Sequence, residues 1–144
     1  MTKAIRINPA TVWRDDAFPF NQAVVEPEGR RVHLTGQVAW DAQGRIVAPE
    51  NPEGQARAAI ENIRLVLDEL GGALSDIVAM TVYFRDDADL PAIQRARKRA
   101  FQKATGPAVT AIKVAGFVAP DLLVEMTATA VIPHERFKAP VQSP

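Results

Sequence analysis

The sequence predicts a single α+β domain in which two helices pack on one face of a mixed β-sheet. Its 144 residues suit one domain and suffice to bury about two thirds of the surface that the unfolded chain exposes. Two stretches have the apolar spacing of amphipathic helices, and shorter stretches with the pattern of strands flank both. This alternation is typical of helices that connect strands of one sheet. We assign the domain to residues 1–134 and a C-terminal tail to residues 135–144.

The composition argues against several classes of function. The chain has no cysteine and therefore no disulfide, thiolate nucleophile or zinc–thiolate site. Its 17 basic and 17 acidic residues cancel, whereas nucleic-acid binding through phosphates needs a positive excess. There is no phosphate loop, dinucleotide fingerprint or metal motif, and no apolar run of a signal peptide or membrane span. We expect a soluble, cytoplasmic protein with no cofactor, metal, nucleic-acid partner or membrane partner.

The first 50 residues predict three strands. Residues 3–7 alternate apolar and polar side chains and predict a short strand. Residues 22–26 and 31–40 flank the turn Pro27-Glu28-Gly29, and this arrangement predicts a hairpin. Gly36 interrupts the second of these strands, so we expect a bulge or a close approach of the backbone to a neighbour there.

The next stretch predicts a helix followed by a central strand. Asn51-Pro52-Glu53 has the order of an N-cap, a first-turn proline and an acidic residue near the positive helix end. The helix ends at Gly71-Gly72, and Ile77–Phe84 is apolar on both faces, as in a covered strand. The apolar stripe of the helix consists of Ala56, Ala59, Ile60, Ile63, Val66, Leu67 and Leu70.

A second helix follows from about Asp86 to Gly106, with a basic face that we interpret as solvated. Residues 108–132 then predict two strands joined by a bend. In the last strand one face is continuously apolar and predicts core: Leu122, Val124, Met126, Ala128, Ala130 and Ile132. The other face is mixed and suits solvent, a cleft or a subunit interface: Leu123, Glu125, Thr127, Thr129 and Val131. With both helices on one side of the sheet, this face stays bare, and we expect self-association.

An ordered set of short motifs across most of the chain resembles the RidA (YjgF) family. The resemblance implies a chorismate-mutase-like fold, a homotrimer, and clefts between adjacent subunits that bind small-molecule metabolites. In the best-known branch these clefts hydrolyse enamines and imines, such as 2-aminoacrylate, to a keto acid and ammonia. The motifs are Phe18-Pro-Phe-Asn-Gln-Ala-Val24, Thr35-Gly36-Gln37, Gln55 with Asn62, Gly71-Gly72 with Asp76, Phe101, Pro107-Ala108 and Val124-Glu125.

The resemblance also implies a set of site residues. Glu125 matches the water-positioning acid and is the expected catalytic residue. The expected substrate-binding residues are Phe20, Thr35, Gly36, Gln94, Val109 and Thr110. Four of these differ from the family pattern. Phe20 occupies the position of a tyrosine, Thr35 that of a serine, Gln94 that of an asparagine and Val109 that of an arginine.

The absent arginine bears on the substrate. A guanidinium–carboxylate contact comprises two hydrogen bonds of about 1.5–3 kcal/mol each, so its loss weakens carboxylate binding by roughly two or more orders of magnitude. We therefore expect little 2-aminoacrylate hydrolysis unless Arg14, Arg85 or Arg97 replaces the missing cation. Two functions remain: a hydrolase of another enamine or imine, and a non-catalytic metabolite-binding trimer that serves as sensor or scaffold. Glu125 as a purely structural strand carboxylate and Phe20 as a packing residue also remain open.

Overall fold

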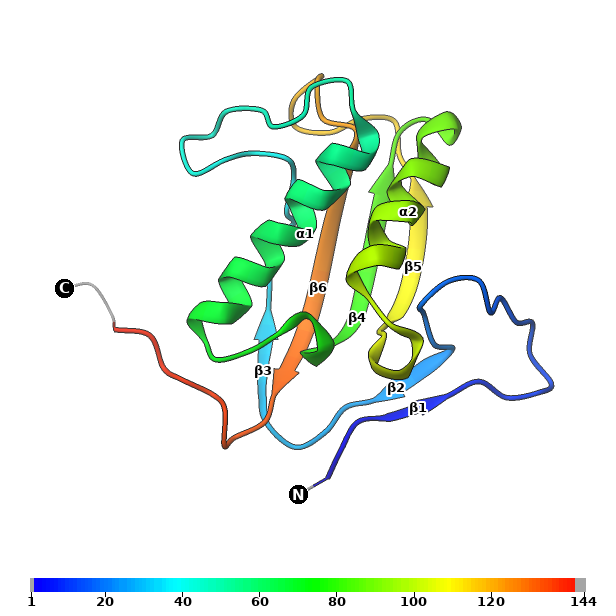
Figure 1. Ribbon diagram of the computed structural model, residues 1–144, viewed down its shortest axis with the longest axis vertical. Coiled ribbons are helices and arrows are strands. Elements are labelled where there is room, and N and C mark those ends of the chain that lie inside the picture. Colours follow the sequence, from blue (N-terminus) through cyan, green and yellow to red (C-terminus); the bar gives the residue numbers. More distant parts are fainter. Residues whose placement is uncertain (1, 142–144) are drawn as a thin grey trace.

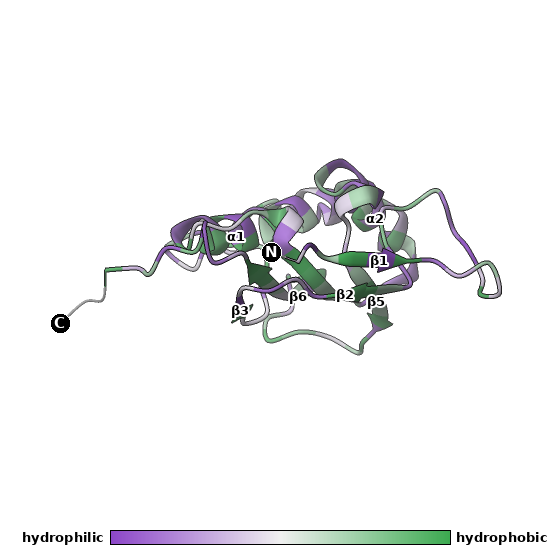
Figure 2. Ribbon diagram, turned by 90° about the horizontal axis from the view of Figure 1, so that it is seen from below, coloured by the Kyte–Doolittle hydropathy of each residue, from purple (hydrophilic) through white to green (hydrophobic). Residues whose placement is uncertain are grey.

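The computed structural model describes residues 2–141, so Met1 and residues 142–144 of the predicted tail lie outside the described residues. A four-stranded sheet with the order β3-β6-β4-β5 is covered on one face by two helices, and its other face is uncovered (Figure 1, Figure 2). The strands are β3 (Arg30–His33), β4 (Ile77–Phe84), β5 (Ala108–Lys113) and β6 (Val124–Ile132), and the helices are α1 (Pro52–Glu69) and α2 (Leu90–Ala100). The predicted α+β class with two helices on one face is confirmed.

The helices connect strands in the predicted way. Strand β4 is antiparallel to β6 and parallel to β5, and β3 is antiparallel to β6. Helix α2 therefore joins two parallel neighbours, while α1 joins β3 to β4 across β6. Both are crossover connections, which need a helix-length segment to return the chain to the start of the next strand.

The predicted hairpin of residues 22–40 is wrong. Strand β2 (Ala23–Val25) pairs with β1 (Ile5–Ile7) in a separate two-stranded sheet, while β3 pairs with β6. The backbone at Gly29 lies against the end of β6, where a Cβ would come 2.8 Å from the carbonyl carbon of Ile132. The chain therefore passes from one sheet to the other at this glycine, and residues 34–40 form only isolated bridges.

The last two strands exist as predicted but are not neighbours, because β4 lies between them. The predicted core face of β6 is confirmed, since Met126 and Ile132 are fully buried within one cluster with α1, α2 and β4. On the opposite face Val131 is buried, whereas Glu125 and Thr127 are half-buried. That face is therefore accessible mainly at its middle and at the Glu125 end.

Helix α1 begins and ends for local reasons, and so does the end of α2. The Asn51 side chain accepts a hydrogen bond of 2.9 Å from the Gly54 N–H and caps α1. Gly71 has φ of 79°, and the Gly72 N–H donates to the Leu67 carbonyl at 2.8 Å, which closes the helix. Helix α2 ends at Ala100, earlier than predicted, because Phe101 adopts an extended conformation and enters the core.

The first residues of the predicted tail contact the domain. Arg136 pairs with the carboxylate of Asp76 at 2.6 Å, and this contact raises the pKa of Arg136. Phe137 packs against the core cluster and lies 4.6 Å below the guanidinium of Arg30. Among residues 2–141, none of the helices has both the length and the apolar character needed to cross a membrane.

Candidate functional site

The carboxylate of Glu125 lies against the backbone at Gly36. Glu125 stands near the start of β6, in register with Tyr83 of β4. Beside it, Gln37 and Met126 exchange two backbone hydrogen bonds of 2.8 and 3.0 Å, which fix the segment that carries Gly36. A Cβ on Gly36 would overlap with Oε2 of Glu125 and come 2.9 Å from its Cδ. The close backbone approach predicted at this glycine is therefore confirmed, and the neighbour is the predicted acid.

Glu125 lines a hollow of about 320 Å³ on the uncovered face of the sheet. The hollow offers a carboxylate, the phenol of Tyr83 and the hydroxyl of Thr127 beside apolar side chains. Within residues 2–141 Glu125 forms no ion pair. Its lining residues are Tyr83, Val114, Gly116, Phe117, Val118, Glu125 and Thr127.

Phe20, Val109 and Thr110 line a second hollow of about 220 Å³ at the β5 edge. Phe20 packs on Trp13 with ring centroids 5.7 Å apart, and the Trp13 side chain is 66% exposed. Val109 is in register with Met80, so it faces the helix side, whereas Thr110 faces the uncovered side. No charged side chain lines this hollow.

A shallow third hollow of about 160 Å³ joins the other two. It shares Thr127 with the Glu125 hollow, and it shares Ala79, Met80 and Thr81 with the Phe20 hollow. A depression with several threonine hydroxyls therefore runs across the uncovered face from Glu125 to Phe20. Thr35 is exposed next to Gly36 but lines none of these three hollows.

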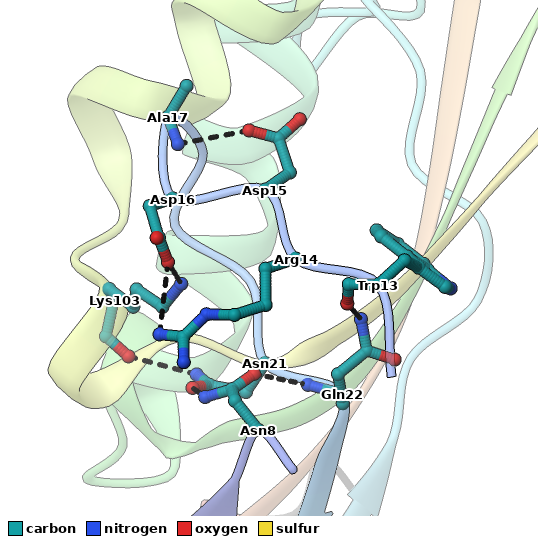
Figure 3. Close-up of polar contacts among 9 residues, drawn as sticks. All are labelled: Asn8, Trp13, Arg14, Asp15, Asp16, Ala17, Asn21, Gln22 and Lys103. Carbon is teal, nitrogen blue, oxygen red and sulfur yellow. Dashed lines mark hydrogen bonds and ion pairs between the residues drawn. The ribbon is translucent and has the colours of Figure 1, made fainter. Parts of the chain in front are cut away.

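The segment that carries Trp13 and Phe20 is held in place by two asparagines (Figure 3). The buried side chain of Asn21 donates to the carbonyls of Lys103 and Gly106, both at 2.9 Å, and accepts from Asn8 at 3.0 Å. The Gln22 side chain in turn donates to the Trp13 carbonyl at 3.2 Å. These hydrogen bonds therefore hold the segment with Trp13 and Phe20 against the residues that precede β5.

An ion pair adds a second attachment for this segment. Asp16 accepts from Lys103 at 2.8 Å and from Arg14 at 3.3 Å (Figure 3). The Lys103 ammonium, followed by the Arg14 guanidinium, holds the pKa of the Asp16 carboxyl below its usual value. Asp16 and Arg14 are exposed and Lys103 is half-buried, so these ion pairs contribute little to stability.

Gln94 lies apart from the other predicted site residues. It is on α2, where its side-chain oxygen accepts from Arg97, and it lines a separate hollow with Phe18. Of the cations considered as replacements for the missing arginine, Arg14 pairs with Asp16, and Arg85 donates to Asp86 and to the Pro120 carbonyl. Neither lines the Glu125 hollow or the Phe20 hollow, and neither does Arg97.

Sequence reasoning missed Tyr83 and Trp13 as site residues. Tyr83 is the only tyrosine of the chain and alternates with buried positions on β4, so strand register could have placed it beside Glu125. Trp13 gave no such signal, because it lies in an irregular segment. In the part of the chain that the structure describes, no group of three or more histidine, aspartate or glutamate side chains could hold a metal ion.

Comparison with known proteins agrees with this fold. The family model described as Endoribonuclease L-PSP matches residues 14–132. A RutC family protein of Synechocystis is 34% identical over 116 residues, which cover 80% of this chain and 87% of the relative. The protein named 3-aminoacrylate deaminase RutC from Acinetobacter baylyi is 31% identical over 69% of this chain and 77% of its own.

Two solved structures extend the likeness. The Rid family protein YyfB of Yersinia pestis, whose function is described as unknown, superposes with a TM-score of 0.80 at 31% identity, over 90% of this chain and 99% of its own. E. coli TdcF with bound serine gives a TM-score of 0.64 at 30% identity, over 79% of this chain and 88% of its own. The matched family model, the relatives and the shared architecture together show that the chain belongs to the RidA (YjgF) family.

Proposed function

We propose that the protein is a homotrimer that hydrolyses an enamine or imine other than 2-aminoacrylate in clefts between adjacent chains. The observation that carries this proposal is the half-buried carboxylate of Glu125, which lies against the backbone of Gly36 in an accessible hollow. A carboxylate held in this way can orient a water molecule and take its proton. The 31% identity to a protein named 3-aminoacrylate deaminase supports the same class of chemistry.

The reaction assigns a role to each polar group of the hollow. An enamine first gains a proton on carbon and loses one from nitrogen, which makes it an imine, and water then adds to the C=N carbon. Glu125 accepts one proton of this water and passes it to the nitrogen, and it then carries the remaining hydroxyl proton to the nitrogen as the C=O bond forms, the C–N bond breaks and ammonia leaves. Imine and water thus give a carbonyl compound and ammonia. The hydroxyls of Tyr83 and Thr127 can donate hydrogen bonds to the oxygen that develops charge.

The uncovered face of the sheet supports self-association. Val118 is 79% exposed and Ile112 is 40% exposed on the segment that borders this face, next to the half-buried Phe117. Apolar side chains that remain exposed together commonly mark an interface with another chain, and contact between identical chains normally closes into a symmetric assembly. A neighbouring chain that covered this face would enclose the Glu125 hollow.

The Phe20 hollow supports a substrate other than 2-aminoacrylate. Val109 packs partly against the core and only borders this hollow, so it brings no cation there, and a carboxylate that is desolvated without a cation is strongly disfavoured. The other side chains of this hollow are uncharged as well. We infer that the reacting enamine or imine has no carboxylate at this point of the cleft.

A second candidate function is non-catalytic metabolite binding by the trimer, as sensor or scaffold. The observation that favours it is the same absence of a charged side chain from the Phe20 hollow. A ribonuclease activity is not part of the proposal, because the net charge of the chain is zero and phosphate binding needs a positive surface.

The test compares wild type with Glu125→Gln, which keeps the size of the side chain and removes the base. Imines without a carboxylate, produced by an amine oxidase, are supplied beside enzymatically generated 2-aminoacrylate, and ammonia release is measured. Wild type should accelerate hydrolysis of the former, and Glu125→Gln should abolish this while the assembly stays intact. Glu69→Gln, at an exposed position at the end of α1, is the matched control and should retain full activity.

Each outcome has a distinct meaning. Saturable binding of a metabolite without turnover would reject the hydrolase in favour of the sensor or scaffold. Full activity of Glu125→Gln would show that Glu125 is structural. Neither binding nor turnover would reject both functions.

A further inference from the structure

Arg97 is a buried guanidinium without a carboxylate partner. Its side chain lies on α2, and the residue is only 3% exposed. Among residues 2–141 no ion pair includes it, and its buried Nε has no hydrogen-bond acceptor. Burial lowers the pKa of Arg97 to about 10, so the group still carries its charge at neutral pH.

This arrangement is unfavourable for stability alone. Buried charges are almost always paired, because an unpaired charge loses its hydration without compensation. Arg97 lies in the last turn of α2, where the helix dipole attracts a cation but leaves Nε without an acceptor. A buried charge without a counter-ion is therefore a candidate for a functional role.

A hollow of about 570 Å³ lies on the same helix, beside Gln94. Gln94 connects the hollow to the buried charge, since its Oε1 accepts from Arg97. A guanidinium can only donate, so this contact fixes the orientation of the amide. The Nε2 group of Gln94 is left as a donor, and it forms no hydrogen bond within the described residues. The lining consists of Phe18, Asp87, Leu90, Pro91, Gln94, Arg95 and Lys98.

The charged side chains that line this hollow leave one cation unpaired. Asp87 pairs with Lys113 at 3.1 Å, and Arg95 pairs with Glu53 on α1 at 3.1 Å. Lys98 has no ion pair among residues 2–141, and it is exposed at the rim. Among the lining side chains, Lys98 is the charge without an ion pair in the described residues, and Arg97 lies behind Gln94.

We propose that this α2 hollow binds a small carboxylate with an apolar body. Lys98 and the Nε2 group of Gln94 meet the carboxylate, Arg97 supplies a fixed positive charge behind Gln94, and the apolar part rests against Phe18 and Leu90. The site lies on the helix side of the sheet and does not use Glu125. It therefore goes beyond the proposed hydrolysis and stands or falls separately from it.

The test is a titration of the full-length protein with benzoate, followed by ¹H–¹⁵N spectra of the arginine Nε and glutamine side-chain groups. The signals are assigned by their loss in Arg97→Lys and Gln94→Leu. Benzoate should shift both signals saturably. Acetate, which lacks the apolar body, and benzylamine, which has the opposite charge, should bind at least about tenfold more weakly, since each lacks one of the two recognised features.

Two matched variants distinguish binding in the α2 hollow from a general effect of positive charge on α2. Lys98→Met should weaken benzoate binding about tenfold, the typical loss of a charge-assisted hydrogen bond. Arg99→Met removes the same charge one residue further along α2, outside the hollow, and should leave the affinity unchanged. Lys98 is exposed, so its variant remains informative even if substitutions of Arg97 prevent folding.

Three results would overturn the proposal. One is the absence of a saturable shift with benzoate, as expected if a second copy of the chain fills the hollow. Another is equal binding of benzylamine. The third is unchanged benzoate affinity in both Lys98→Met and Gln94→Leu.

Discussion

Arg97→Met should raise the free energy of unfolding, because it removes a buried charge that lacks a carboxylate partner. The difference between a pKa of about 10 and the ordinary pKa of an arginine corresponds to roughly 3 kcal/mol against the charged form. The substitution also removes the hydrogen bond to Gln94, worth about 1.5–3 kcal/mol because the donor is charged. Methionine fills most of the same space with a flexible apolar chain. We expect a net gain of roughly 1 kcal/mol.

Urea denaturation of both proteins measures this difference. The pKa of Arg97 is lowered in the folded state, so the unfolded chain holds the proton more tightly. The destabilisation of the folded state by the charged Arg97 is therefore fully present below about pH 10 and decreases only as the pH rises further. Between pH 6 and pH 9 the gain should thus stay constant. The control Arg99→Met should change stability by less than about 0.5 kcal/mol.

The opposite result would refute this reasoning. If Arg97→Met lowered the free energy of unfolding by more than about 1 kcal/mol while Arg99→Met did not, Arg97 would have a stabilising partner in the assembled protein. A gain in stability together with loss of benzoate binding would instead indicate that the buried charge is retained for ligand binding at the expense of stability.

Three further predictions concern the proposed clefts and the residues that border them. Light scattering should give about three times the chain mass of 15.7 kDa, and a stable monomer at micromolar concentration would remove the proposed clefts. Gly36→Ala should displace the flexible Glu125 carboxylate at a cost below about 1.5 kcal/mol while abolishing imine hydrolysis; full activity would show that the contact is not functional. Val109→Arg should raise 2-aminoacrylate hydrolysis by at least about tenfold, because it restores a bidentate donor. Robust wild-type release of pyruvate would show that another cation already fills this role.

Local signals predicted both ends of α1 and the existence of α2, whereas they did not predict which strands pair. Asn51 and Gly71 act through neighbouring residues, so their roles follow from the sequence alone. The pairing of β3 with β6 depends on the contact between Gly29 and Ile132. These residues are about a hundred positions apart in the sequence, so no local pattern can predict the contact. The hairpin prediction was wrong for this reason, although the strands themselves were recognised.

The candidate site shows the same division. Alternation along β6 placed Glu125 opposite the core face, and the glycine inside a predicted strand indicated a close neighbour. That this neighbour is Glu125 itself requires the bridge between Gln37 and Met126. The separation of Gln94 from Phe20 was not predictable, because it depends on which side of the sheet each residue occupies.

The segment Phe18–Phe20 explains why the two proposed binding sites can be tested independently. Phe18 lines the α2 hollow, and Phe20, two residues later, lines the hollow at the β5 edge. Between them, the carbonyl of Pro19 lies against Gly106, where a Cβ would come 3.1 Å from the Pro19 carbonyl carbon. Asn21 also binds the Gly106 carbonyl, so both sides of the segment are fixed to the residues before β5. Because this attachment restrains the segment, a substitution at Lys98 should not disturb the Phe20 hollow, and a substitution at Val109 should not disturb the α2 hollow.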